Sequence, residues 1–265
     1  MFACMRHGHK AGEVIMEESE KICALNNLIQ GSRNIVFFGG AGVSTESGIP
    51  DFRSTDGLYN QKYAYPPETI LSHTFYRDRP EEFFRFYLDK ILIPVGNAGP
   101  NAAHRKLAQW ENEGRLRVVI TQNIDGLHQA AGSKNVLELH GSILRNFCEE
   151  CGCFHTADEV KQSLRAGKMV PRCKKCGGRV KPDVVLYEEG LNMETLQRAA
   201  SAIAEADVLI IGGTSLVVYP AAGLIDYYQG NKLVLINKSA TARDAQADLV
   251  ISAPIGEVFN QIKTS

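Results

Sequence analysis

A glycine-rich loop near the start of the chain carries the first sign of chemistry. Residues 35–38 (IVFF) form an apolar run typical of a buried strand, and the sequence GGAGVSTESGIPDFR follows directly. Backbone at a glycine can approach a ligand that a Cβ would exclude, so Gly40-x-Gly42 predicts a dinucleotide-binding turn. Thr45 stands where the usual third glycine would lie. The loop continues to Arg53 and is longer and more polar than hydride transfer requires.

Two further strand ends carry polar groups. The segment Thr121-Gln122-Asn123-Ile124-Asp125 follows an apolar stretch, VVI, and parallel sheets bind ligands at this edge. Amide and carboxylate groups at 123 and 125 suit a carboxamide and a ribose, although an ordinary loop would also be polar. His140 follows VLEL and precedes a glycine. A histidine at a strand end is a candidate general base near neutral pH.

Four of the seven cysteines form two spaced pairs. Cys148-x-x-Cys151 and Cys173-x-x-Cys176 are separated by 21 residues, a spacing that favours one tetrahedral zinc ion with four sulfur ligands. A closed site of this kind is structural. The alternative is two unrelated pairs of buried cysteines. Cys153 is a spare thiol, while Cys4 and Cys23 fill apolar space or remain free.

Basic residues gather around the second cysteine pair. Residues 161–181 hold eight Lys or Arg and no acidic residue. This pattern fits a solvated face, a surface for an acidic partner protein, or a zinc ribbon for nucleic acid.

Later loops add candidate contacts. Gly213-Thr214-Ser215 follows the apolar strand VLII and predicts a second cofactor contact, and Asn237 suits a ribose or adenine edge, or a simple turn. An extended peptide could add as a strand between two rails. The residues of these rails are Val184, Val185, Leu186 and Tyr187 on one side, and Val217, Val218 and Tyr219 on the other.

The elements that must position these groups alternate along the chain. Such alternation predicts an α/β fold with a Rossmann-like parallel sheet and helices on both faces, plus a small zinc-ribbon and helical domain. We predict strands at 35–38, 115–120, 135–142, 183–187, 207–212, 232–237 and 248–252. We predict helices at 17–30, 101–113, 193–206 and 220–229, a last one from Ile255, and short helices over 56–93, the clearest being PEEFFRFYLDKIL.

The same pattern predicts a division into domains. Segments 17–55, 94–146 and 183–265 form the Rossmann-like domain, 56–93 the helical part of a small domain, and 147–182 the zinc-binding module. Residues 1–16 show no periodicity and are expected to be disordered.

Composition excludes several classes of protein. The 265 residues are 44% hydrophobic and 22% charged, with a formal net charge of −1. These values predict a globular protein with no membrane span and no specific nucleic-acid partner. Seven cysteines without a secretory signal predict a reducing, cytoplasmic location.

Taken together, the motifs resemble the sirtuin family of NAD-dependent protein deacylases, in its bacterial type. The resemblance covers nearly the whole chain from about Glu17. The matching segments are 40–44, 47–53, 57–59, 121–128, 139–141, both cysteine pairs, 213–215 and 218–220. The resemblance implies NAD as co-substrate, one structural zinc, and acetyl-lysine proteins as substrates in a cleft between two domains. We also predict a monomer, without a sequence motif that bears on oligomeric state.

The resemblance also assigns roles to residues. It implies that His140 is the general base and that Asn123 and Asp125 take part in catalysis, while Phe52 and Arg53 close the loop over the cofactor. The predicted cofactor-binding residues are Gly40, Ala41, Gly42, Ser44, Thr45, Ile49, Asp51, Phe52, Arg53, Gln122, Asn123, Ile124, Asp125, Gly213, Thr214, Ser215, Asn237 and Ile255.

The implied reaction transfers an acetyl group from lysine to the ADP-ribose part of NAD. Its products are free lysine, nicotinamide and O-acetyl-ADP-ribose. Cleavage of the nicotinamide–ribose bond develops positive charge on the sugar, which the acetyl oxygen attacks. His140 then acts as a base through the ribose hydroxyls.

Departures from the family pattern bear on the substrate. Relatives that prefer succinyl-lysine carry Tyr-x-x-Arg, whereas the chain has Tyr87-Leu88-Asp89-Lys90. A lysine lacks the planar fork that grips a carboxylate, so we predict acetyl-lysine as the better substrate. The usual Phe-Gly-Glu is replaced by Tyr187-Glu188-Glu189, and Thr45 stands where many relatives have alanine.

Alternatives remain on the same scaffold. They are a mono-ADP-ribosyltransferase, a desuccinylase, and a silent NAD or ADP-ribose sensor or zinc-dependent binding module. A dehydrogenase fits least, because the third glycine of the fingerprint is absent.

Overall fold

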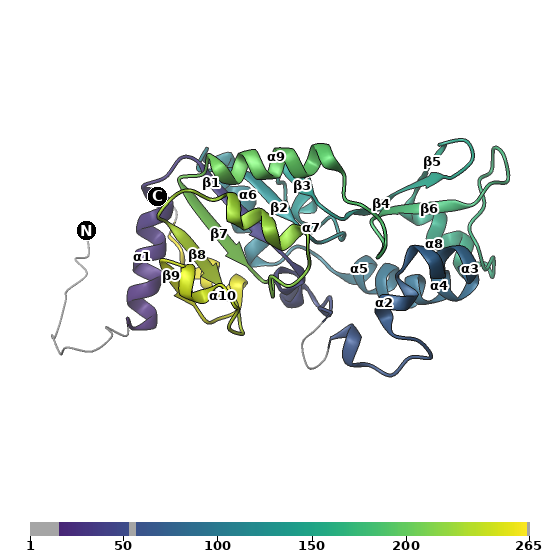
Figure 1. The fold of residues 1–265 in the computed structure, drawn as a ribbon, viewed down its shortest axis with the longest axis horizontal. Helices are drawn as coiled ribbons and strands as arrows, with labels where there is room; N and C mark the ends of the chain where they lie inside the picture. The colour runs from purple at the N-terminus through teal and green to yellow at the C-terminus, as the bar shows by residue number, and fades with distance from the viewer. Residues whose placement is uncertain (1–15, 53–56, 264–265) are drawn as a thin grey trace.

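The structure is a computed structural model that describes residues 16–52 and 57–263. The predictions that fall on residues 1–15, including Cys4, and on Arg53 lie outside the described residues. Figure 1 shows two parts of unequal size, a larger α/β part that holds the first and the last of the described helices and a smaller part beside it.

The larger part is built on a sheet of six parallel strands. Its strand order is β3-β2-β1-β7-β8-β9. The strands are β1 (Ile35–Gly39), β2 (Leu116–Thr121), β3 (Val136–Glu138), β7 (Val208–Gly212), β8 (Leu233–Ile236) and β9 (Leu249–Ile251). Every residue of β1 and of β7 is buried, which explains why these strands read as unbroken apolar runs.

Helices cover both faces of this sheet, as predicted. The helices α1 (Glu18–Gln30), α6 (Ala102–Asn112) and α10 (Ile255–Gln261) pack on the face that Ile35 and Phe37 enter. The opposite face, which receives Val36 and Phe38, is covered by α9 (Met193–Ala204) and the segment 221–227. The alternation of β1 side chains between the two cores follows from the two-residue period of a strand.

The strand order reverses direction between β1 and β7. From β1 the chain moves outward to β2 and β3, and the later strands β7, β8 and β9 build outward on the other side. In open parallel sheets, ligands bind beyond the carboxyl ends of the strands at such a point. The expected location is therefore the pair of loops after Gly39 and Gly212, which end paired strands at the same register.

The smaller part combines short helices with a second sheet. Its helices are α2 (Pro67–Ile70), α3 (His73–Asp78), α4 (Pro80–Tyr87), α5 (Ile93–Asn97) and α8 (Ala157–Arg165). The antiparallel strands β4 (Gly141–Cys148), β5 (Phe154–Thr156) and β6 (Val180–Val184) have the order β5-β4-β6. Aromatic residues of α3 and α4 and residues of β4 and β6 share one core.

Four predicted elements differ from the structure. The strand predicted at 183–187 is β6 at 180–184, and it pairs antiparallel with β4 in the small sheet. The strand predicted at 135–142 is divided into β3 and β4, because the chain turns at Gly141, the first residue of β4, which adopts a φ of 75°. The helix predicted at 220–229 is a 3₁₀-helix at 221–227. The long helix PEEFFRFYLDKIL contains a π-turn at 88–92.

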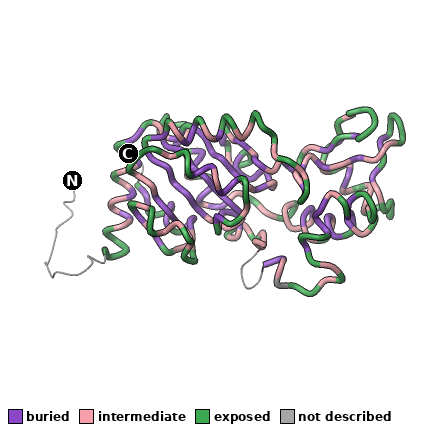
Figure 2. The backbone as a smooth tube through the Cα atoms, in the orientation of Figure 1, coloured by how far each residue is buried: buried purple, intermediate pink, exposed green. Residues whose placement is uncertain are grey.

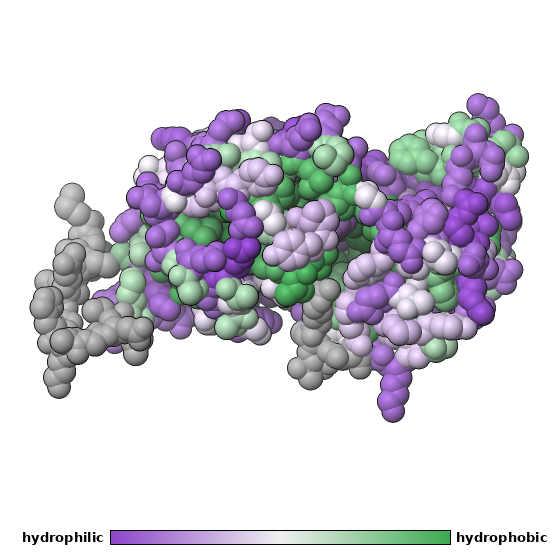
Figure 3. Space-filling model, viewed as in Figure 1, coloured by the Kyte–Doolittle hydropathy of each residue, from purple (hydrophilic) through white to green (hydrophobic). Residues whose placement is uncertain are grey.

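Burial follows these layers. Figure 2 shows the buried backbone concentrated in the strands of the large sheet. Figure 3 shows apolar surface between the large and the small part. No helix of the described ranges 16–52 and 57–263 is long and apolar enough to cross a membrane.

Candidate active site

The glycine loop after β1 lies directly against the loop after β7. The Gly42 N–H donates to the Gly213 carbonyl oxygen over 2.8 Å. A Cβ at Gly42 would come within 2.8 Å of the Gly213 Cα, and a Cβ at Gly40 equally close to the Thr214 Cβ. Both glycines are thus required for contact between the two loops, in addition to any contact with a ligand.

A buried polar chain links the first loop to the loop after β2. The Asn123 side-chain amide donates to the Ser44 hydroxyl over 3.0 Å, and this hydroxyl donates to the Asp125 carboxylate over 2.6 Å. The second Asp125 oxygen accepts the Leu127 N–H over 2.9 Å. Asn123 and Asp125 are each 8% exposed. Burial raises the pKa of Asp125, and the bonds from Ser44 and Leu127 oppose this rise.

The candidate base stands between the two sheets. His140 is half-buried between the ends of β3 and β4, and its Nδ1 lies 2.9 Å from the Gln122 carbonyl oxygen. A carbonyl oxygen only accepts hydrogen bonds, so Nδ1 carries the proton and Nε2 keeps a lone pair. Burial lowers the pKa of His140, and the bond to Gln122 opposes this effect. The imidazole is therefore poised as a neutral base at Nε2.

Hydrogen bonds connect this base to the loops after β7 and β8. The Gln122 side chain donates to the Thr214 hydroxyl over 3.0 Å. Thr214 N–H donates to the Asn237 side-chain oxygen over 2.9 Å, and the Asn237 amide returns a bond to the Thr214 carbonyl oxygen over 3.0 Å. Asn237 thus fixes the Thr214 backbone. Ser215, the next residue, is exposed.

Two residues that sequence reasoning missed support the glycine loop. The Glu46 carboxylate accepts the Gly256 N–H over 2.7 Å, which ties the loop to the first turn of α10 beside Ile255. The Asn101 side-chain amide donates to the Val43 carbonyl oxygen over 2.7 Å. Asn101 also caps α6, and its place after Pro100 was the only signal for it in the sequence.

Within the same loop, Ser47 has a buried hydroxyl with no hydrogen-bond partner among the described residues. Thr45 donates to the Gly42 carbonyl oxygen, and Ile49 N–H donates to the Ser44 carbonyl oxygen. An unsatisfied buried hydroxyl beside these turns fits a site that takes a polar ligand.

The far end of this loop contacts the small part. Leu58 and Tyr59 donate backbone bonds to the carbonyl oxygens of Asp51 and Phe52. The Phe52 and Tyr59 rings lie 5.5 Å apart, and the Tyr59 hydroxyl forms a short contact with the Tyr187 hydroxyl. Phe52 and Ile124 both pack against the core of the small part. This loop therefore connects the predicted cofactor-binding residues to Tyr187 of the first predicted substrate rail.

The two predicted rails differ in character. Val185 donates to the His140 carbonyl oxygen, and Tyr187 donates to Leu71, so the first rail is fixed on one side. On the second rail, Val217 is 55% and Tyr219 66% exposed, and both follow Leu216, which adopts a φ of 56°. Large exposed apolar side chains of this kind are typical of an interaction surface.

Four cysteine sulfurs converge in the small part. The Sγ distances are 3.4 Å for Cys148–Cys176, 3.8 Å for Cys151–Cys173 and 3.4 Å for Cys151–Cys176. Zinc–sulfur bonds of about 2.3 Å in a tetrahedron place sulfurs about 3.8 Å apart, so this arrangement fits a four-sulfur zinc site. Cys153 is not one of the four; its sulfur groups with His155 and Cys173.

Comparison with known proteins decides the family. A model described as the Sir2 family matches residues 40–220. The chain is 58% identical to an NAD-dependent protein deacetylase of Clostridium acetobutylicum over 245 residues, which is 92% of the chain and 98% of that protein. It is equally similar, at 58% over 246 residues and with the same coverage, to one of Clostridium perfringens. The chain belongs to the Sir2 family.

Solved Sir2 structures share the fold. One with a p53 peptide and NAD⁺ has a TM-score of 0.81 and 38% identity, and covers 93% of the chain and 97% of its own. A Sir2 variant with a deacetylated p53 peptide and 3′-O-acetyl ADP ribose has a TM-score of 0.84 and 38% identity, over 91% and 96%. The predicted sirtuin resemblance and fold class are confirmed.

Proposed function

We propose that this Sir2-family chain is an NAD-dependent protein lysine deacetylase. The reaction converts an acetyl-lysine protein, NAD and water to free lysine, nicotinamide and O-acetyl-ADP-ribose. One observation carries the proposal: a histidine with its Nδ1 proton fixed and Nε2 free stands at the edge of the sheet where Ser44, Asn123 and Asp125 form a buried polar chain. The curated relatives of both clostridia bear the same activity in their names.

The loops at the carboxyl ends of β1, β2, β7 and β8 would hold NAD. The Ser47 hydroxyl lacks a hydrogen-bond partner among the described residues, and the hydrogen-bonded side chains of Ser44, Asn123 and Asp125 are buried. Both features are expected where a protein binds a polar ligand. When bound, NAD supplies a ribose carbon that becomes reactive as nicotinamide leaves. The buried carboxylate of Asp125 lies in an environment of low dielectric, where its charge acts more strongly than in water.

His140 would remove a proton from a ribose hydroxyl at Nε2. Its Nδ1–H bond to Gln122 fixes both the tautomer and the orientation of the ring. The same bond stabilises the protonated imidazole, because both ring nitrogens then donate. The Gln122 side chain is held by its hydrogen bond to Thr214. His140 is therefore connected, through Gln122, to the loop after β7.

The four-cysteine site would hold a structural zinc. All four ligand positions would be filled by sulfur, which leaves no open position for substrate or water. The ion would stabilise β4, β6 and α8, whose shared core includes Cys148 and Cys173.

The acyl group is proposed to be acetyl. Tyr87 is 1% exposed and stacks on Phe83 at a centroid distance of 5.8 Å, so its hydroxyl does not reach the surface. The Lys90 ammonium lies 3.4 Å from the Gln61 side-chain oxygen and 5.5 Å from the Tyr63 ring centroid. The Tyr87 hydroxyl is buried, and Lys90 lacks the guanidinium fork that would hold a succinyl carboxylate with two hydrogen bonds. The monomeric state and the cytoplasmic location stay predictions.

The test is nicotinamide release from NAD with and without a peptide that contains acetyl-lysine. We expect release only with the acetylated peptide, and slower release with the same peptide succinylated. Release with an unacylated peptide that gains ADP-ribose would favour the transferase instead. NAD binding without any release would favour the silent sensor, and faster desuccinylation would contradict the acyl preference.

A further inference from the structure

Glu188 has an unusual backbone conformation at the end of the first substrate rail. Its φ is 75°, in the left-handed region that glycine favours. A non-glycine residue persists in this conformation only where its surroundings hold it. Leu216, after the loop of Thr214, is the one other non-glycine residue in the described ranges with a positive φ.

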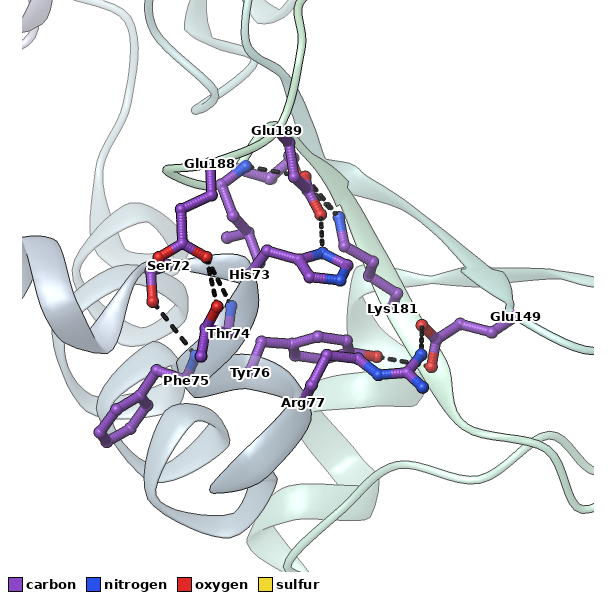
Figure 4. A network of polar contacts seen from close by, with 12 residues as sticks. Ser72, His73, Thr74, Phe75, Tyr76, Arg77, Glu149, Lys181, Glu188 and Glu189 are labelled. Carbon is purple, nitrogen blue, oxygen red and sulfur yellow. Dashed lines mark hydrogen bonds and ion pairs between the residues drawn. The ribbon is translucent and has the colours of Figure 1, made fainter.

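The Glu188 side chain provides that support. Its carboxylate accepts the Thr74 N–H over 2.8 Å and the Thr74 hydroxyl over 2.7 Å, at the first turn of α3 (Figure 4). These two bonds attach the Glu188 side chain to α3 and help to hold its backbone in the left-handed conformation. They also lower the pKa of Glu188, so the group is ionised at neutral pH.

The neighbouring carboxylate, that of Glu189, lies against basic side chains, whereas the Glu188 carboxylate does not form an ion pair within the described residues. Glu189 lies 2.8 Å from His73 Nδ1 and 3.1 Å from Lys181 Nζ, and it also accepts the Leu186 N–H over 2.9 Å (Figure 4). Within the described parts of the chain, no Lys, Arg or His forms an ion pair with Glu188. Glu188 is exposed, so it presents a negative charge to solvent.

Backbone groups at the same place are available to a ligand. Leu186 and Tyr187 use their N–H and carbonyl groups within the protein. Among the hydrogen bonds of the described residues, none uses the N–H or carbonyl of Glu188, or the carbonyl of Val185. An unpaired edge of this kind accepts an added strand. A peptide on the rail would thus pass directly beside the Glu188 charge.

We propose that Glu188 is a specificity-determining residue that favours acetyl-lysine peptides with a cationic side chain next to the acetyl-lysine. This inference rests on the proposed deacetylase function. The attachment to Thr74 holds the carboxylate in one place, so its attraction acts on the flanking residues of the peptide rather than on the acetyl group. The effect should be that of one exposed ion pair, which is modest and weakens as salt is added.

The test compares kcat/KM for peptides that are identical except for Lys, Ala or Glu at the positions flanking acetyl-lysine. For the unaltered protein we expect the Lys peptide to exceed the Glu peptide by about two- to fivefold at low salt. Glu188→Gln keeps an acceptor for Thr74 and removes only the charge, so the ratio of kcat/KM for the Lys peptide to kcat/KM for the Glu peptide should fall to about one.

Two more variants complete the design. Glu188→Lys should reverse the preference toward the Glu peptide. Glu18→Gln removes another exposed carboxylate, on α1 at the other end of the molecule in Figure 1, and should leave the preference intact. An unchanged preference in Glu188→Gln and Glu188→Lys would overturn the inference. Absence of turnover with every peptide in the unaltered protein would instead refute the proposed function.

Discussion

The imidazole Nδ1 of His140 lies 2.9 Å from the backbone carbonyl oxygen of Gln122. This contact decides which ring nitrogen is basic, because the carbonyl oxygen requires a donor. It also attaches the candidate base to the loop after β2, whose neighbouring residues Asn123 and Asp125 form the buried polar chain with Ser44. The base and the polar chain are thus parts of one loop system.

Replacing His140 tests its role directly. His140→Asn retains an amide donor for the Gln122 carbonyl but has no group equivalent to Nε2. We expect kcat to fall by about 10²- to 10⁴-fold, the usual contribution of a positioned general base. The measurement is turnover of an acetylated peptide, with thermal unfolding as a check on the fold. A stable variant with near-normal kcat would contradict the assignment.

The pH dependence of activity follows from the same residue. Burial lowers the pKa of His140 below its ordinary 6.5, so the neutral base persists to more acidic pH than for a free histidine. We expect the acidic limb of kcat/KM against pH to have its midpoint below 6.5. A midpoint above 6.5 would show that the histidine gains a proton more readily than the structure implies.

Removal of zinc should destabilise the small part. Cys176→Ser deletes one of the four converging sulfurs, and we expect loss of bound metal together with a lower unfolding temperature. Cys153→Ser is the matched control, since Cys153 lies outside the four-cysteine group. Metal analysis and thermal unfolding of both proteins give the answer. Equal metal content in Cys176→Ser and the unaltered protein would argue against the site.

Two buried histidines predict sensitivity to acid. The ring centroids of His104 and His128 lie 4.7 Å apart. Burial lowers the pKa of His104 to about 4 and the pKa of His128 to about 3. The unfolded chain therefore takes up protons below pH 6.5 while the folded chain does not, so stability falls as pH falls. Between pH 7 and pH 5 each histidine should remove about 2 kcal/mol from the free energy of unfolding.

His128→Phe isolates this effect. Neither ring nitrogen of His128 has a hydrogen-bond partner among the described residues, so an apolar ring of similar shape should be tolerated. Denaturant unfolding at pH 7 and pH 5 should show a smaller loss of stability in the variant than in the unaltered protein. The same loss in both proteins would show that His128 does not contribute.

Much of the fold was predictable because each strand of the large sheet is mainly apolar and ends at, or just before, a small or polar residue. The strand predicted at 183–187 was placed in the Rossmann-like domain, whereas the strand found there, β6, pairs with β4 of the small sheet, which begins where the chain turns at Gly141. That turn depends on a contact in space: a Cβ at Gly141 would meet the Asp183 carbonyl oxygen. Local sequence does not report such an approach.

The residues of the candidate site also fall into two groups, those that the sequence predicts and those that only the structure shows. Residues at strand ends, such as Asn123 and His140, were predictable because parallel strands bring their carboxyl ends to one edge. The supports Glu46 and Asn101 were not, because each acts through a partner distant in the sequence. The charge at Glu188 was visible as a departure from the family motif, but its attachment to Thr74 required the structure.

The most direct test of the central claim is mass analysis of both products after incubation of an acetyl-lysine peptide with NAD. We expect the peptide to lose its acetyl group and the same acetyl group to appear on ADP-ribose, in equal amount to the nicotinamide released. His140→Asn should form both products about 10²- to 10⁴-fold more slowly. Free acetate without acetylated ADP-ribose, or a peptide that gains ADP-ribose, would contradict the proposed function.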